Sequence, residues 1–426
     1  MKILHTSDWH LGRTLYGKKR DIEFAQFLAW LKDTINQQKI DILLVAGDIF
    51  DTTTPSHNAQ SLYYQFLCDV ASTGCQHIVI IAGNHDSPSF LNAPKSILSH
   101  LNVHVVGAKS DSVTEEVLLL ENKKDLSSPL AIICAVPYLR DKDLRQQNSG
   151  ESIDEKQQKL VEGLKQHYHS VCKEAVLLQE KLLEMGQTKV PIIGMGHLFA
   201  AGGITTEGDG VRDLYVGNLA HISAEAFPKE LDYVALGHLH SHQLVGKHSH
   251  IRYSGSPIAM GFGEANQTKK VLIVEFTPVT SKTESVTFTI EEIVIPVFQP
   301  LVRIEGDLDK ILHALDDLLA RKSTAWVEVE YNAKTLVPDL RRIIDSHIEG
   351  SFLEIRRIKN RLIFDSILKR EKETETLEDL TPLDIFKRCL EANNVIDEKE
   401  QSELISLFNE SLYAIENMKH NDEDES

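Results

Sequence analysis

The sequence predicts an α/β fold with a mainly parallel sheet, followed by a small α+β domain and a pair of C-terminal helices. Short β-branched, apolar runs alternate with segments whose apolar residues recur at helical spacing, which is typical of βαβ units. This rhythm changes after Pro278, where shorter strand and helix patterns begin. A charged segment then precedes two amphipathic stretches, which we interpret as a linker and two helices.

Composition limits the class of protein. The chain has 426 residues, enough for two or three domains with at least one sizeable core. Its five cysteines form no Cys-x-x-Cys pair, as is usual for reduced thiols. Signal-peptide and transmembrane patterns are not found, so we expect a cytoplasmic protein without a membrane partner. The net charge of −18 argues only weakly against nucleic acid, because bound cations would offset the acids of a metal site.

The first domain is expected to span residues 1–278. Its strands are predicted from runs of isoleucine, leucine and valine, and its helices from one-sided apolar spacing. The strands lie within Ile3–Ser7, Ile40–Ala46, Gln76–Ala82, Ala131–Val136, Pro191–His197 and Tyr233–His240, with edge strands at Ile251–Pro257 and Val271–Phe276. The helices lie within Arg20–Gln37, Ala59–Ala71, Pro88–His100 and Glu151–Met185, the last being one long helix or two.

The second domain is expected to span residues 285–365, and it contains none of the histidine and aspartate motifs described below. Its expected strands are Pro300–Glu305, Ala325–Tyr331 and Phe352–Ile358, and its expected helices are Asp307–Ala320 and Leu336–His347. Residues 370–420 should form the linker and the terminal helices, the first opening with Thr381 as N-cap and Pro382 in its first turn. Residues 421–426 form an acidic tail.

Aspartate, asparagine and histidine side chains follow the apolar strands. Carboxyl ends of parallel strands are where ligands bind in open α/β sheets. A lone Asp-x-His is more often a surface pair than a metal site. Several such motifs at buried strand ends, however, would cost desolvation free energy unless their side chains are paired or bound to a metal. A set of carboxylates, an amide oxygen and imidazoles suits two divalent cations that share a carboxylate, and this mixture of nitrogen and oxygen donors favours Mn, Fe or Zn over Mg. The set is Asp8, His10, Asp48, Asn84, His85, His197, His238 and His240.

The order of these motifs resembles that of the calcineurin-like metallophosphoesterases. The motifs are Asp8-x-His10, Gly47-Asp48-x-x-Asp51, Gly83-Asn84-His85-Asp86, His197 and Gly237-His238-x-His240. The segments 5–12, 46–51, 82–87 and 253–257 are similar to those of the SbcD subfamily, the nuclease subunits that act with the SbcC ATPase. The resemblance implies a metallophosphoesterase β-sandwich flanked by helices. It also implies that the small α+β domain caps DNA and that the terminal helices dock on SbcC.

The resemblance further implies roles for the site residues. One cation, Mn²⁺ by preference, would be held by Asp8, His10, Asp48 and His240. The other would be held by Asp48, Asn84, His197 and His238, with Asp48 shared. His85 would face the scissile phosphate and stabilise the transition state or protonate the leaving oxygen. Asp51 would orient His85 through its carboxylate, although a loop-capping acid is an equal alternative.

Three functions are compatible with the sequence. The first is an ATP-controlled DNA nuclease subunit, a double-strand 3′–5′ exonuclease and single-strand or hairpin endonuclease in DNA end processing, repair and recombination. The second is a phosphodiesterase or phosphatase on the same scaffold, which would need neither the extra domain nor the terminal helices. The third is a non-catalytic DNA-end scaffold, which would not need a complete ligand set. The first agrees best with the whole chain.

Partner surfaces are predicted from three patterns. A basic run with an aromatic residue follows the first motif and would contact DNA, unless it is only a solvated helix entrance; it comprises Arg13, Tyr16, Lys18, Lys19 and Arg20. Apolar residues on short helices would form a homodimer face or, equally, core; they are Leu62, Tyr63, Phe66 and Phe90, with Leu67 and Leu91. The terminal helices would bind SbcC, in a heterotetramer with two copies of each subunit, through Leu383, Phe386, Leu390, Leu404, Leu407 and Phe408.

Overall fold

The chain forms two compact units, Met1–Leu301 and Val302–Ser426. A computed structural model describes residues 1–123, 125, 128–144, 152–200, 222–277, 285–333 and 337–360, and the single positions 383, 404, 405 and 408. The first unit contains two six-stranded sheets, and the second contains a three-stranded sheet. A small two-stranded hairpin, β2 (Thr14–Leu15) and β3 (Lys18–Lys19), also belongs to the first unit.

The first sheet carries four parallel strands, and on one side it is extended by two more strands that each pair antiparallel with the strand before them. In spatial order its strands are β14 (Phe288–Val294), β13 (Lys270–Phe276), β1 (Lys2–Thr6), β4 (Ile42–Ala46), β5 (His77–Ile81) and β6 (Val103–Val106). The second sheet likewise has a parallel centre between two antiparallel outer strands. Its order is β11 (Gln243–Val245), β12 (His248–Tyr253), β10 (Tyr233–Gly237), β9 (Ile192–His197), β8 (Pro129–Ala135) and β7 (Val117–Glu121).

The two sheets pack face to face and helices cover their outer faces. Strand β4 illustrates the layering, because neighbouring side chains of a strand point to opposite faces. Leu44 belongs to the core shared with the second sheet, whereas Leu43 and Val45 belong to the core under the helices. Both faces are therefore apolar, which explains why the predicted strands are continuous hydrophobic runs. This α/β sandwich confirms the predicted fold class.

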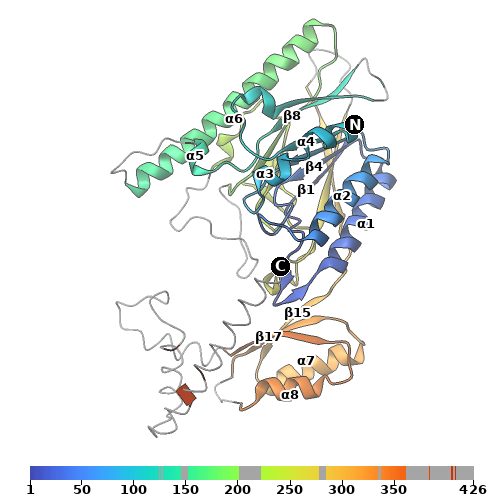
Figure 1. Cartoon of the computed structure of the whole chain (residues 1–426), viewed down its shortest axis with the longest axis vertical. Coiled ribbons are helices and arrows are strands. Elements are labelled where there is room, and N and C mark those ends of the chain that lie inside the picture. The colour runs from blue at the N-terminus through green and yellow to red at the C-terminus, as the bar shows by residue number, and fades with distance from the viewer. Residues whose placement is uncertain are drawn as a thin grey trace. The chain divides into compact units, whose positions relative to one another are not determined.

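Helices α1 and α2 lie side by side over the first sheet, and the long α6 covers the second (Figure 1). Helix α6 begins with a capping box, in which the Ser152 hydroxyl accepts from the Glu155 amide while the Glu155 carboxylate accepts from the Ser152 amide. The helices are α1 (Asp21–Gln38), α2 (His57–Ala71), α3 (Pro88–Asn92), α4 (Lys95–Leu98), α5 (Asp141–Leu144) and α6 (Ile153–Glu184). Single 3₁₀ turns are η1 (Ser99–Leu101), η2 (Val113–Glu116), η3 (Ala224–Ala226) and η4 (Phe262–Glu264).

Several boundaries differ from the prediction. The segments that we expected at sheet edges, β12 and β13, each lie between two strands. Strand β14 pairs with β13, so the first unit extends to Leu301 rather than ending at residue 278. The helix expected over Pro88–His100 is broken into α3, α4 and η1, because Pro94 lacks the amide proton that an uninterrupted helix needs. Where one long helix or two were expected, Ile153–Glu184 forms one helix.

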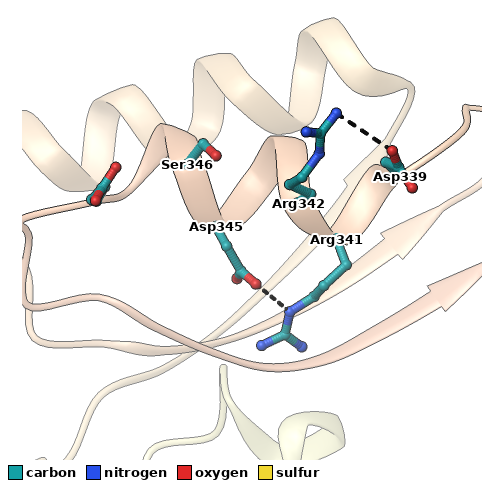
Figure 2. Close-up of a pocket in the computed structure, with 6 residues that line it drawn as sticks. Asp339, Arg341, Arg342, Asp345 and Ser346 are labelled. Atoms are coloured by element: carbon teal, nitrogen blue, oxygen red, sulfur yellow. Dashed lines mark hydrogen bonds and ion pairs between the residues drawn. The ribbon is translucent and has the colours of Figure 1, made fainter.

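The second unit is a small α+β domain. A core rich in isoleucine, leucine and valine joins its sheet to two helices. Its elements are β15 (Leu301–Gly306), α7 (Leu308–Ala320), β16 (Trp326–Tyr331), α8 (Leu340–His347) and β17 (Glu354–Asn360). Figure 2 shows the exposed face of α8, where Arg341 pairs with Asp345 at 2.7 Å and Arg342 pairs with Asp339 at 3.4 Å. Such surface pairs stabilise a helix by about 0.2–0.5 kcal/mol each.

Little of the predicted C-terminal region is described. Leu383, Leu404 and Phe408 are helical and half-buried. The partner-binding residues Phe386, Leu390 and Leu407 lie outside the described residues, as do the linker and the acidic tail. Among the helices that are described, none combines the length and the apolar character needed to cross a membrane.

The predicted dimer face is mostly core. Tyr63 and Phe66, both on α2, are only 1% and 3% exposed and belong to the core between the helices and the first sheet. They therefore cannot supply a dimer surface, which corrects that prediction; Leu67 and Leu91 are buried in the same core. Helical spacing marks a buried face but does not say whether the same chain or a second copy covers it. Leu62 and Phe90 are half-buried against this core.

We expect Phe66→Ala to lower the free energy of unfolding by about 3–5 kcal/mol, because it removes a buried ring. The Phe66 ring lies edge-on to Trp9, with 5.3 Å between ring centroids. Urea denaturation followed by tryptophan fluorescence, at two protein concentrations, measures the effect. Ile22→Ala is the control, since Ile22 is 79% exposed. A loss of stability that appears only at low protein concentration would instead place Phe66 in a dimer interface.

Candidate metal centre

The sequence-predicted ligands converge at one edge of the sandwich. Strands β1, β4 and β5 run parallel in one sheet, and β9 and β10 run parallel in the other. His197 is the last residue of β9, and the loops after the carboxyl ends of the other four strands carry Asp8, His10, Asp48, Asn84, His85, His238 and His240. The His197 imidazole also joins the two sheets here, because its Nδ1 donates to the Ala46 carbonyl at 2.9 Å.

Three ligands gather on one side of the centre. Asp8, His10 and His240 place ligand atoms within 4.8 Å of one another, and all three residues are buried. The Nε2 atoms of His10 and His240 face each other at 3.2 Å. This group matches three of the four ligands that the sequence predicts for one cation.

A second group lies beside the first. Asp8, Asp48 and His197 also place ligand atoms within 4.8 Å of one another. The Asn84 amide oxygen lies 2.9 Å from Nε2 of His197 and 3.0 Å from Nδ1 of His238. Asp8 belongs to both groups, and Asp48 also lies between them, since its Oδ2 lies 3.3 Å from His197 Nε2 and 3.6 Å from His10 Nε2.

The chemistry of these donors fits divalent cations. Burial lowers the pKa of His10 to about 4, and burial with the neighbouring His197 lowers that of His238 to about 3. Their imidazoles are therefore neutral at pH 7, which is the form that can bind a metal ion. Burial also lowers the pKa of His197, but the Asp48 carboxylate outweighs it and raises the value to about 9. The buried centre thus attracts positive charge, which bound dications would supply.

The backbone of the ligand loops is unusual. Asp8, His10 and Asp48 have φ angles of 53°, 49° and 50°, and His238 has a φ of 104°. Non-glycine residues rarely adopt this left-handed region, and each costs of order ~1–3 kcal/mol unless its surroundings hold it. Hydrogen bonds hold two of these loops together, from the Asp8 amide to the Gly47 carbonyl and from the His10 amide to the Asp48 carbonyl, each at 3.0 Å.

Asp86 stabilises the loops that carry the ligands. It was not among the predicted site residues. Its buried carboxylate accepts from the amides of Gly83 at 2.8 Å, Phe50 at 3.0 Å and Ile49 at 3.1 Å. Burial, with the nearby Asp48 charge, raises its pKa to about 7. Asp86 thereby ties the loop of Asp48 to the loop of Asn84. Its place at the end of the Gly-Asn-His-Asp motif was the available sequence signal.

Asp51 contacts His85 differently from the prediction. The His85 Nδ1 lies 2.8 Å from the main-chain carbonyl oxygen of Asp51 and therefore carries the donated proton. The Asp51 carboxylate instead lies 3.3 Å from His10 Nδ1 and 3.1 Å from Arg13 Nη1. The predicted carboxylate–imidazole hydrogen bond is therefore wrong, because the main-chain carbonyl accepts the His85 proton; the Asp51 carboxylate lies within 4.8 Å of a His85 ring nitrogen but pairs with His10 and Arg13.

The predicted basic run divides into two parts. Arg20 is only 2% exposed, forms a bidentate pair with Glu23 and donates to the Ala259 carbonyl. It is therefore structural, which corrects its assignment to DNA binding. Tyr16 is 45% exposed at the tip of the β2–β3 hairpin and stacks on Phe262. Lys18 and Lys19 form strand β3 of the same hairpin.

Gly83→Ala is expected to weaken Mn²⁺ binding at least tenfold without unfolding the protein. A Cβ at Gly83 would collide with the carboxylate and the amide of Asp48, and a displaced ligand lowers metal affinity. Isothermal titration calorimetry measures the binding. Gly74→Ala is the matched control, because a Cβ there meets no atom within 4 Å. Unchanged Mn²⁺ affinity in Gly83→Ala would contradict the role given to Asp48.

Comparisons with known proteins agree with this arrangement. The family model described as calcineurin-like phosphoesterase matches residues 1–242. A second model, described as type 5 capsule protein repressor C-terminal domain, matches residues 297–394.

Similar proteins match almost the whole chain. The SbcD subunit of the nuclease SbcCD from Escherichia coli (strain K12) is 35% identical over 421 residues, which cover 97% of this chain and 98% of that protein. The SbcD subunit of the nuclease SbcCD from Bacillus subtilis (strain 168) is 31% identical over 424 residues, with 98% and 99% coverage. The chain therefore belongs to the calcineurin-like phosphoesterase family and, within it, to the SbcD subunits of SbcCD nucleases.

Proposed function

We propose that this protein is a metal-dependent DNA nuclease subunit that acts with SbcC in DNA end processing, repair and recombination. One observation carries the proposal: ligands from strand ends of two different sheets meet around the Asp48 carboxylate. The names and full-length similarity of the relatives support the same activity. A small-molecule phosphoesterase on this scaffold remains the competing function, but it gives no reason for the second unit.

The proposed metal assignment is the one that the family resemblance implies, and the two groups of ligands support most of it, with Asp8 present in both groups. One cation is held by Asp8, His10, Asp48 and His240, and the other by Asp48, Asn84, His197 and His238. We propose Mn²⁺, because mixed imidazole and carboxylate donors suit it better than Mg²⁺. When bound, such a pair supplies a nucleophile from water at neutral pH and offsets negative charge on the phosphate.

His85 is the proposed catalytic residue of the protein itself. Its Nδ1 donates to the Asp51 carbonyl, so Nε2 is the atom that accepts or delivers a proton. The His85 amide donates to Asp48 Oδ1 at 2.8 Å, and the ring lies edge-on to His10 with 4.8 Å between centroids. These contacts hold the imidazole beside the proposed cations. We propose that Nε2 protonates the leaving 3′ oxygen of the DNA or stabilises the negative charge of the transition state at the scissile phosphate.

DNA would approach over the β2–β3 hairpin. Tyr16 exposes an aromatic ring on which a base can stack, and Lys18 and Lys19 place cations on the same hairpin. Arg13 is nearer the centre, paired with Asp51 at 3.1 Å. These lysines make the hairpin locally positive, although the whole chain has a net charge of −18.

The proposed assembly combines several surfaces. The second unit would cap DNA, the terminal residues Leu383, Leu404 and Phe408 would dock on SbcC, and Leu62 with Phe90 would belong to a homodimer face. A heterotetramer with two copies of each subunit follows from this arrangement. We propose a cytoplasmic location, since the four described cysteines are free thiols and the proposed substrate is chromosomal DNA.

The decisive test is degradation of linear duplex DNA by the purified protein with SbcC, ATP and Mn²⁺. We expect chelation to abolish cleavage. His85→Ala should lower the turnover rate about 10²–10⁴-fold, the range for a lost acid–base group, while Mn²⁺ binding measured by calorimetry stays intact. Hydrolysis of an aryl phosphodiester without any cleavage of DNA would favour the competing phosphoesterase function.

Asp51→Asn should behave differently from His85→Ala. The His85 bond uses the Asp51 main chain, so the substitution leaves that bond in place and removes the charge that pairs with His10 and Arg13. We expect nuclease activity to fall about 10–100-fold at limiting Mn²⁺, as for other groups that support a metal ligand, and to recover at saturating Mn²⁺. Activity that stays low at every Mn²⁺ concentration would restore the predicted role of the Asp51 carboxylate in proton transfer.

A further inference from the structure

Glu264 lies behind the ligand His240, on the side away from the proposed cations. The 3₁₀ turn η4 places its side chain in the interior, where it is fully buried. Its Oε1 is 3.2 Å from His240 Nδ1. Carboxylates are almost never fully buried unless they are paired, so this contact requires an explanation.

The surroundings hold the other carboxylate oxygen in place. Glu264 Oε2 accepts from the Met260 amide at 3.1 Å and the Ser256 hydroxyl at 3.3 Å, and it pairs closely with the ammonium of Lys269. The same ammonium donates to the His240 carbonyl oxygen at 3.0 Å. Lys269 therefore fixes both the carboxylate and the backbone of the histidine that the carboxylate contacts. Oε1 is left facing the imidazole.

We propose that Glu264 is a positioning residue that selects the tautomer and the ring orientation of His240. With the proton held on Nδ1, the lone pair of Nε2 faces His10 Nε2, 3.2 Å away, where a shared cation would be bound. This inference rests on the proposed metal-dependent function and extends it to a residue outside the strand-end motifs. Carboxylates that accept from a metal-ligating histidine raise its basicity and fix its geometry.

The two proposed cation sites differ in the group that accepts a hydrogen bond from the histidine ligand. His240, on one side, is backed by the charged Glu264 carboxylate, whereas His197, on the other, is backed by the neutral carbonyl of Ala46 at 2.9 Å. A change at Glu264 should therefore weaken one site and spare the other. A merely structural role would lower stability without distinguishing the two sites.

The test is a Mn²⁺ titration of the full-length protein and its variants by isothermal titration calorimetry, with electron paramagnetic resonance of the manganese. Glu264→Gln removes the charge and keeps the shape. Glu264→Asp keeps the charge beside Lys269, and therefore the fold, but withdraws the oxygen from His240. Glu116→Gln is the matched control, because Glu116 forms a similar buried pair with His167 at 2.7 Å and contacts no proposed ligand.

We expect both Glu264 variants to bind one Mn²⁺ with wild-type affinity and the second about 10–100-fold more weakly. The spin-coupled signal of paired manganese should give way to that of a single ion, while Glu116→Gln keeps the wild-type titration. Wild-type affinity at both sites in Glu264→Gln and Glu264→Asp, or equal weakening at both, would overturn the inference. A protein that binds two Mn²⁺ and loses one in these variants, yet never cleaves DNA, would overturn the proposed nuclease function alone.

Discussion

The carboxylate of Asp48 is the group on which the rest of the site depends. Its Oδ2 lies within 3.6 Å of imidazole nitrogens from two different sheets, and its Oδ1 accepts the His85 amide. Burial alone would raise its pKa, yet the surrounding imidazoles, His197 above all, hold that pKa well below its usual range. A charged carboxylate at the junction of two sheets requires positive charge around it. The fold buries this negative charge between its two sheets, and bound cations would supply the positive charge that it requires.

A second layer of groups makes that junction rigid. Asp86 connects the loops after β4 and β5, the Ala46 carbonyl orients His197, and the Glu264–Lys269 pair supports His240. In front of them, main-chain hydrogen bonds from the Asp8 and His10 amides to the loop after β4 stabilise the ligand residues whose backbone lies in the left-handed region. Local strain at the site is thus offset by buried hydrogen bonds in the same loops. Such preorganisation is what a two-cation centre needs to hold its geometry during turnover.

The sequence predicted the fold class and the set of converging residues, because buried parallel strands are continuous apolar runs and their polar ends must meet at one edge. It could not predict features that depend on the direction of a loop or on which segment packs or pairs with another. Whether Asp51 presents its carboxylate or its carbonyl to His85 is decided by one turn of a loop. Phe66 has the same helical spacing for a core as for an interface, and Glu264 follows no strand. The pairing of β14 with β13 lacked a signal in either segment alone.

Anomalous diffraction from crystals grown with Mn²⁺ tests the central claim most directly. The shared role of Asp48 predicts two manganese peaks about 3.5–4 Å apart, with the Asp48 carboxylate bound to both and Asp8 and His197 on opposite sides. A single peak, or two peaks of which only one contacts Asp48, would contradict the account.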